Sequence, residues 1–133
     1  MVFWRGERKG MTEPRGLRLL RDARRFVANS WCRGADARDE SGSEVAPWDE
    51  QAASWSLLGA LVAALEHEAS RLGEVPLGEL GAALFALADL IETDSLVEWN
   101  DDPRQTQANV IAVLDRAAAT YLPPEAVLEL SLN

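Results

Sequence analysis

Two short groups of residues place aromatic rings beside charged and amide side chains. The first group is Trp31 with the pair Arg38-Asp39, and the second is Trp99–Asp101 with Arg104. A large ring next to hydrogen-bonding groups can line a small-molecule pocket or anchor a partner protein. Such residues also cap helices and tie loops together at the end of a bundle, so both interpretations stay open. The candidate binding residues are Trp31, Arg38, Asp39, Trp99, Asn100, Asp101 and Arg104.

Other catalytic or metal-binding patterns are sparse. The chain has one histidine, His67, and one cysteine, Cys32, which are too few for a zinc site of clustered Cys and His within one chain. A nucleophilic Cys32 would need a base such as His67, and no spacing brings the two together. We therefore interpret them as a buried thiol and a surface histidine. We predict no metal and no cofactor, because the aspartates lack the spacing of a calcium loop.

The elements that must position the candidate residues are helices. Apolar residues at spacings of three and four predict helices over residues 12–30, 52–72, 76–93 and 102–121, and residues 124–130 can form a short fifth helix. Strand signals are weak because β-branched residues are sparse. The predicted fold is all-α, a single-domain bundle of four main helices.

We expect the helix over residues 52–72 to be buried at the centre of this bundle. Its apolar stripe is Trp55, Leu58, Val62, Leu65, Ala69 and Leu72, and a second apolar row is Leu57, Leu61 and Ala64. A helix that is apolar on most of its circumference is typical of a core position. Asp49 is predicted to cap its start, Trp48 to pack back on its first turns, and Gly73 to end it. Charges return at Glu66, His67 and Glu68, where we expect the helix to emerge into water.

The two connections over residues 31–48 and 93–102 carry the candidate residues, and we predict that they converge at one end of the bundle. The second connection leads into the fourth helix. There Asp102 is predicted as the cap, with Pro103 at the first helical position and Gln105 three residues after the cap.

Composition favours one soluble domain, with residues 1–10 as a flexible N-terminal arm and 11–133 as the helical domain. Met1 and Met11 both stay open as the native start. No apolar run approaches the roughly 20 residues that cross a bilayer, there is no secretory signal, and a single cysteine suits a reducing compartment. We therefore predict a cytoplasmic protein that does not contact a membrane.

The net charge of −9 is divided unevenly along the chain. Residues 1–35 carry +6, and the remaining residues carry −15. The basic segment over residues 5–25 can contact nucleic acid, dock on the acidic remainder of the same chain or of a second copy, or form a solvated helix face. We expect no nucleic-acid binding except through this segment.

Four motifs, taken in order, resemble an uncharacterised family of small all-helical bacterial and phage proteins. They are W-C-x-G from Trp31, A-R-D from Ala37, W-x-L-x-G-A from Trp55 and W-N-D from Trp99, and the likeness spans about residues 17–120. The resemblance brings no activity with it. It implies that the two connections form one shared feature. Ser56 stands where the resemblance places a second cysteine, which argues against a two-thiol redox or metal site.

We expect a non-enzymatic protein-binding or regulatory module with a protein partner or a second copy of itself. The arginines of the first helix and the acidic surface are its expected charged contacts. One alternative is a small enzyme or ligand-binding protein, in which Arg38 or Arg104 holds an anionic substrate and Asp39 or Asp101 acts as base. A further alternative is an acidic mimic of nucleic acid from a mobile element, which would prefer carboxylates spread over one exposed face.

Overall fold

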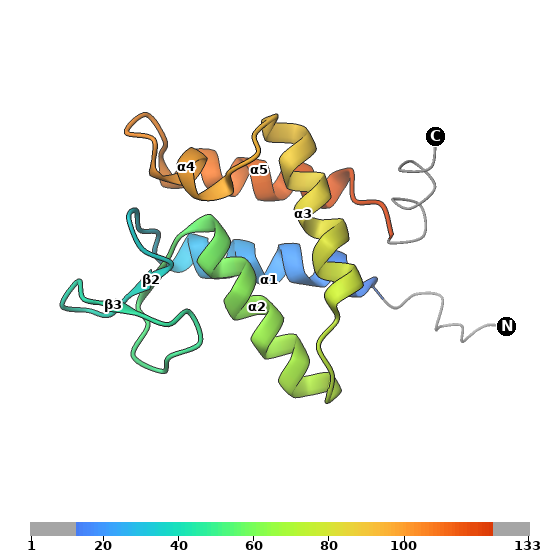
Figure 1. Cartoon of the computed structure of the whole chain (residues 1–133), viewed down its shortest axis with the longest axis horizontal. Helices are drawn as coiled ribbons and strands as arrows, with labels where there is room; N and C mark the ends of the chain where they lie inside the picture. The colour runs from blue at the N-terminus through green and yellow to red at the C-terminus, as the bar shows by residue number, and fades with distance from the viewer. Residues whose placement is uncertain (1–12, 124–133) are drawn as a thin grey trace, which may run out of the picture.

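Helices dominate the computed structural model, which describes residues 13–123 (Figure 1). The helices are α1 (Arg15–Asn29), α2 (Leu57–Leu72), α3 (Leu77–Ile91), the six-residue α4 (Leu96–Asp101) and α5 (Gln107–Ala119). The predicted all-α class with four main helices is confirmed. The predicted N-terminal arm over residues 1–10 and the short helix over residues 124–130 lie outside the described residues. Within residues 13–123, no helix is both long and apolar enough to cross a bilayer.

A small antiparallel sheet interrupts the connection between α1 and α2, where no strand was predicted. It consists of β2 (Ala37–Arg38), β3 (Glu44–Val45) and β4 (Ser54–Trp55) in the order β3-β2-β4. Ala37 lies opposite Val45 on one side and opposite Trp55 on the other. Strands of two residues are too short to show an alternating pattern, because that pattern needs at least four residues to be read.

The central helix is α1 rather than α2. It packs against α2, α3, α5 and β4, and in Figure 1 it runs between α2 and α5. Leu19, Leu20, Ala23 and Val27 of α1 are completely buried. The sequence did not indicate a central position for α1, because its arginines confine the apolar residues to one side of the helix.

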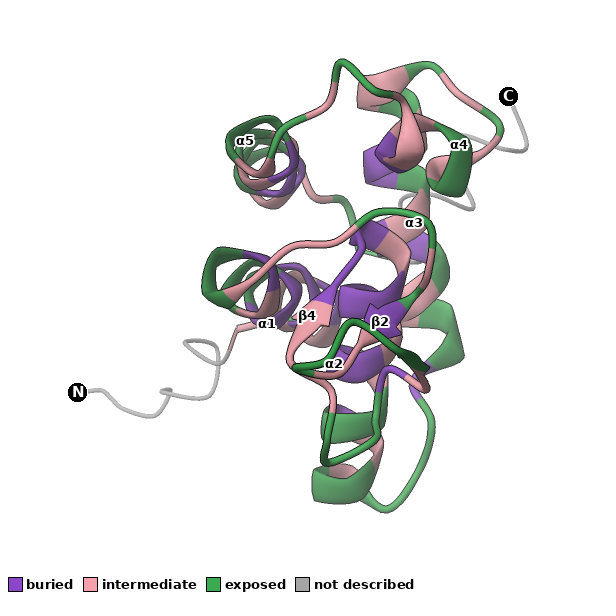
Figure 2. Ribbon diagram, turned by 90° about the vertical axis from the view of Figure 1, so that its left-hand side faces the viewer, coloured by how far each residue is buried: buried purple, intermediate pink, exposed green. Residues whose placement is uncertain are grey.

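The predicted core face of α2 is wrong by one row of residues. Leu57, Leu61 and Ala64 are completely buried, whereas Leu58 and Val62 are only half-buried. The principal neighbours of α2 are α1, α4 and β4, and Figure 2 shows the buried residues of α1 and α2 on the sides by which these helices meet. Too few elements surround α2 to cover its whole apolar circumference, so the row nearest α1 becomes the core.

The start of α2 is also later than predicted, although its end at Gly73 is confirmed. Ser54 and Trp55 pair with β2 instead of extending the helix. The Ser56 hydroxyl then accepts the backbone N–H of Gly59 at 3.0 Å and caps α2 in place of Asp49. At the other end Gly73 adopts the left-handed conformation with a φ of 80°, which glycine favours.

The start of α5 was predicted four residues too early. Its cap is Thr106, whose side chain accepts the backbone N–H of Asn109 at 3.1 Å. Arg104 donates its backbone N–H and its guanidinium to Asp102, and Arg33 donates to the carbonyls of Pro103 and Gln105. These contacts hold residues 102–105 as a turn, so the proline does not begin the helix.

Glu68 is a buried acid at a position where α2 was expected to reach water. Its side chain is 0% exposed and accepts Arg18 Nε at 2.8 Å and Arg71 Nη2 at 2.9 Å. Burial raises the pKa of Glu68, but the hydrogen bonds and charges of Arg71 and Arg18 lower it further than burial raises it. The carboxylate therefore joins α1 to α2 in its charged form.

Replacing Glu68 by glutamine is expected to lower the free energy of unfolding at pH 7 by about 1.5–3 kcal/mol, the range for hydrogen bonds to charged groups. Because folding lowers the pKa of Glu68, its contribution is complete above the unfolded value of about 4.3 and is lost as pH falls through the folded value. Urea unfolding of both proteins at pH 7 and pH 3 measures this. The difference between wild type and variant should shrink at pH 3, while the neighbouring exposed Glu66→Gln should change little at either pH. A difference that is the same at both pH values would contradict the assignment.

Candidate functional site

Asn100 is a completely buried side chain that joins three segments. Its Oδ1 accepts Trp31 Nε1 at 2.8 Å and the backbone N–H of Leu57 at 3.0 Å. Its Nδ2 donates to the Cys32 carbonyl at 3.2 Å and to Asp101 Oδ1 at 3.1 Å. Leu57 is the first residue of α2, where backbone N–H groups lack helical partners. We call Trp31, Cys32, Leu57, Asn100 and Asp101 the junction cluster.

The residues around the junction cluster fasten the two connections to each other. Asp101 Oδ1 also accepts the backbone N–H of Gly34 at 3.0 Å. The guanidinium of Arg33 lies 4.7 Å from the ring centroid of Trp31 and donates to the carbonyls of Pro103 and Gln105. Arg33 was not among the predicted site residues. Its role depends on a partner about 70 residues away, so no local pattern could have identified it.

Arg38 and Asp39 hold the turn between β2 and β3 together. The Arg38 guanidinium donates to the carbonyl of Gly42 at 2.9 Å and to that of Arg33 at 3.1 Å. Asp39 Oδ1 accepts the hydroxyl and backbone N–H of Ser41 and the backbone N–H of Ser43. These hydrogen bonds, led by the Ser41 hydroxyl, lower the pKa of Asp39. Both side chains thus form hydrogen bonds within the connection between α1 and α2.

Trp99 and Arg104, the other two predicted site residues, do not join the junction cluster through a hydrogen bond. Trp99 is half-buried and packs against the core. Arg104 is 88% exposed at its side chain and lies 2.8 Å from Asp102. The hydrogen bond from Arg104 keeps the pKa of Asp102 well below its usual range. Of the seven predicted residues, the structure joins Trp31 and Asp101 through Asn100, which forms a hydrogen bond with each.

Cys32 supplies its backbone carbonyl to the cluster rather than its thiol. The Sγ atom lies 3.7 Å from the carbonyl oxygen of Ala35. Burial raises the pKa of the Cys32 thiol, although Ser54 and Arg38 act in the opposite direction. The reactive thiolate form is therefore disfavoured at neutral pH.

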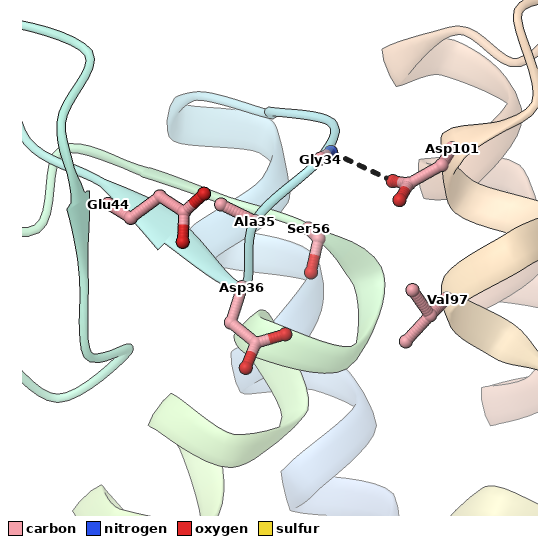
Figure 3. A pocket seen from close by; sticks show the side chains of 7 residues that line it. All are labelled: Gly34, Ala35, Asp36, Glu44, Ser56, Val97 and Asp101. Carbon is pink, nitrogen blue, oxygen red and sulfur yellow. Dashed lines mark hydrogen bonds between the residues drawn. The ribbon is translucent and has the colours of Figure 1, made fainter.

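A polar pocket of about 260 Å³ lies beside the junction cluster (Figure 3). Its lining residues are Gly34, Ala35, Asp36, Glu44, Ser56, Val97 and Asp101. Figure 3 shows Asp36 and Glu44 on the sheet side of the pocket and Val97 and Asp101 on the α4 side. No lysine, arginine or histidine lines it, and no group of three or more His, Cys, Asp and Glu among residues 13–123 is placed to hold a metal ion. The pocket therefore lacks an arginine that could hold an anionic substrate.

A second hollow, which we call the aromatic groove, lies between α1, α2 and the loop before β4. Its volume is about 350 Å³. Its apolar lining is Phe26, Pro47, Trp48, Ala52, Trp55 and Ala63, and its polar lining is Asp49, Glu50, Glu66, His67 and Ser70. The rings of Phe26 and Trp55 lie 4.8 Å apart at 53°, and Trp55 Nε1 donates to the Pro47 carbonyl at 3.0 Å. These contacts fix the groove floor in place.

Trp48 stands at this groove with 61% of its surface exposed, instead of packing on the first turns of α2. The turn that carries it is held by two hydrogen bonds, from the Asp49 N–H to the Ala46 carbonyl and from the Ala52 N–H to the Asp49 carbonyl. Sequence reasoning omitted Trp48 from the candidate residues. The available signal was a tryptophan in a loop rich in turn residues, but only the later start of α2 leaves its ring uncovered.

The arginines of α1 are paired with acids of the same chain. The ion pairs, with N···O distances of 2.5–3.2 Å, are Arg15–Glu74, Arg18–Glu68, Arg21–Glu13, Arg24–Asp115 and Arg25–Asp22. Three of these acids lie in the acidic remainder of the chain. Arg15, Arg18 and Arg24 thus contact the acidic remainder of the same chain, while Arg21, Arg24 and Arg25 stay exposed.

Comparison with known proteins identifies one family. The model of DUF6197, a family of unknown function, matches residues 11–120. Neither the curated proteins nor the solved structures contain a significant match to this chain. The matched range includes both the junction cluster and the aromatic groove.

Proposed function

The chain belongs to DUF6197, a family of unknown function, and since membership brings no activity with it, we propose a function from the geometry. The protein is a non-enzymatic binding module that contacts a partner protein through the aromatic groove. The observation that carries this proposal is the exposed Trp48 ring on a hydrogen-bonded turn beside a fixed aromatic floor.

An exposed tryptophan in this setting has the properties of a binding hot spot. Tryptophan is enriched among residues that dominate interface energies. A ring on a turn that is already ordered loses little conformational entropy when a partner covers it. Phe26 and Trp55 line the same groove as Trp48 and add apolar side chains to its floor. Together these features provide a compact anchor for a protein surface.

The enzyme alternative has less support from the same geometry. Arg38 and Arg104 bond to groups of their own loops, and Asp39 and Asp101 accept hydrogen bonds from backbone N–H groups. A catalytic arginine or base needs to face a substrate with free bonding capacity. Asn100 uses all four of its hydrogen-bonding positions inside the junction cluster, so the cluster acts as a structural joint in this proposal.

The proposal extends to the setting in which the protein works. The resemblance to small bacterial and phage proteins and the single cysteine support the cytoplasm of a bacterium or of a phage-infected cell. The partner can be a different protein or a second copy of this chain. Light scattering over a range of protein concentrations separates these two cases, because self-association raises the mean mass with concentration.

Replacing Trp48 by alanine is expected to reduce partner binding by at least about thirtyfold, since hot-spot truncations cost about 2 kcal/mol or more and each 1.4 kcal/mol is about tenfold. Because the ring is mostly exposed, the free energy of unfolding should change by less than about 1 kcal/mol. The measurement is affinity capture from the source organism with quantitative mass spectrometry, with urea unfolding of the same proteins.

The matched control is Leu77→Ala, which removes an apolar side chain that is 67% exposed on α3. A protein that is captured by the wild type and by Leu77→Ala but not by Trp48→Ala is the expected result. Capture that is equal for all three proteins would place the binding surface elsewhere and reject the proposal.

A further inference from the structure

The carboxylates around the aromatic groove form no ion pair with a lysine or arginine within the part of the chain that the structure describes. Asp49, Glu50 and Glu66 are all exposed. None of them takes part in an ion pair among residues 13–123, and neither lysine nor arginine lines the groove. The arginines of α1, by contrast, all have acidic partners. Even with His67 in the lining, the three carboxylates outnumber the basic side chains there, so the groove keeps a negative rim.

The size of the groove limits what enters it. Its volume of about 350 Å³ lies at the lower end of the roughly 300–1,000 Å³ of small-molecule pockets. This leaves room for one or two apolar side chains above Phe26 and Trp55. An apolar floor inside an acidic rim is complementary to an apolar residue that has cationic neighbours.

Building on the proposed function, we propose that the groove binds a basic segment of a partner protein that carries one large apolar residue among lysines or arginines. The apolar side chain enters beside Trp55, and its cationic neighbours lie at Glu50 and Glu66. A cation can also lie over the exposed Trp48 ring, which adds a cation–π attraction. Nucleic acid does not fit, because the rim carboxylates repel phosphates.

Selection from a random library of 12-residue peptides on phage, with the full chain as the target, tests this inference. Clones that also bind Trp48→Ala are removed. The expected result is enrichment of peptides with several lysines or arginines around an aromatic or large aliphatic residue. Enrichment of acidic or uncharged peptides, or no enrichment beyond that seen with Trp48→Ala, would overturn the inference.

Fluorescence anisotropy with the best enriched peptide then tests the rim charges. The double variant Glu50→Gln/Glu66→Gln should bind about three- to tenfold more weakly at low salt, as expected for exposed charge pairs. The loss should largely disappear at 1 M salt, where the screening length is about 3 Å. The control Asp89→Asn/Asp94→Asn makes the same change of net charge at two exposed positions away from the groove, and its affinity should match the wild type. Equal losses in both double variants would reject specific pairing at the rim.

Two further outcomes separate this inference from the proposed function. If captured partners depend on Trp48 but the charge variants bind them normally, the groove binds protein and the basic segment is the wrong occupant. If the selection enriches basic peptides only when it is repeated on a chain that lacks residues 1–10, those residues occupy the groove in the full chain and the partner peptide is rejected. Capture that does not depend on Trp48 rejects the proposed function itself.

Discussion

Replacing Asn100 by aspartate is expected to destabilise the protein by about 3 kcal/mol or more, the range for burying an unpaired charged group. The new carboxylate still accepts the N–H groups of Trp31 and Leu57. Its second oxygen, however, faces the Cys32 carbonyl and the Asp101 carboxylate, which accept the amide N–H groups in the wild type. One nearly isosteric change therefore replaces two attractions by two repulsions inside a completely buried cluster.

The pH dependence of this variant has a definite sign. Burial and the neighbouring Asp101 raise the pKa of the introduced carboxyl group in the folded state above its unfolded value of about 3.9. The loss of stability should therefore be smallest below the unfolded pKa of about 3.9, where the carboxyl group is protonated in both states and can donate one hydrogen bond. The loss should increase as pH rises from there to the folded pKa, and should be complete above the folded pKa. Urea unfolding at pH 3.5 and pH 7, for wild type and variant, measures the change.

Asn109→Asp is the matched control for this experiment. Asn109 is exposed at the third position of α5, where a negative charge interacts favourably with the helix dipole. Its stability at pH 7 should equal or slightly exceed that of the wild type. A similar loss for both variants would contradict the central role of Asn100 in the junction cluster.

Replacing Gly59 by alanine is expected to destabilise the protein by about 3 kcal/mol, at the upper end of the cost of overpacking. A Cβ atom at this position would lie 1.8 Å from the carbonyl oxygen of Asp36 and 2.6 Å from its carbonyl carbon. These are backbone atoms, and the same Asp36 carbonyl accepts the N–H of Ser56 at 3.0 Å. Relief of the clash must therefore move the segment before β2 away from the start of α2.

Gly81→Ala provides the opposite expectation on another helix. Gly81 lies within α3, and apart from its own turn of helix backbone and its chain neighbours no atom lies within 4 Å of a Cβ built there. The same substitution should stabilise the protein by about 0.5–1 kcal/mol, since alanine favours a helix over glycine by this amount. Urea midpoints of the two variants should lie on opposite sides of the wild type. Equal midpoints would mean that the close approach at Gly59 is unimportant.

Local chemistry in the sequence determined the helical class and several helix ends. The apolar stripes predicted four main helices, and Gly73 and Pro76 marked the connection between α2 and α3. These signals succeed because a helix bonds residues four apart, and because glycine and proline act on the backbone at their own positions. The sequence also predicted that Trp31, Asn100 and Asp101 lie at the same end of the bundle, although it left open whether they bind a ligand or join loops.

The tertiary structure decided which of several local options each segment adopts. Asp49, Asp102 and Thr106 are all acceptable helix caps, yet only Thr106 is used, because the strand pairing of Trp55 and the contacts of Arg33 occupy the other two segments. Asn100 became a buried joint, and Trp48 became the exposed ring. The partners of Asn100 outside α4 lie 43 to 69 residues away in the chain, and the exposure of Trp48 follows from the pairing of Ser54 and Trp55 with β2. Contacts of this kind leave no periodic trace in the sequence.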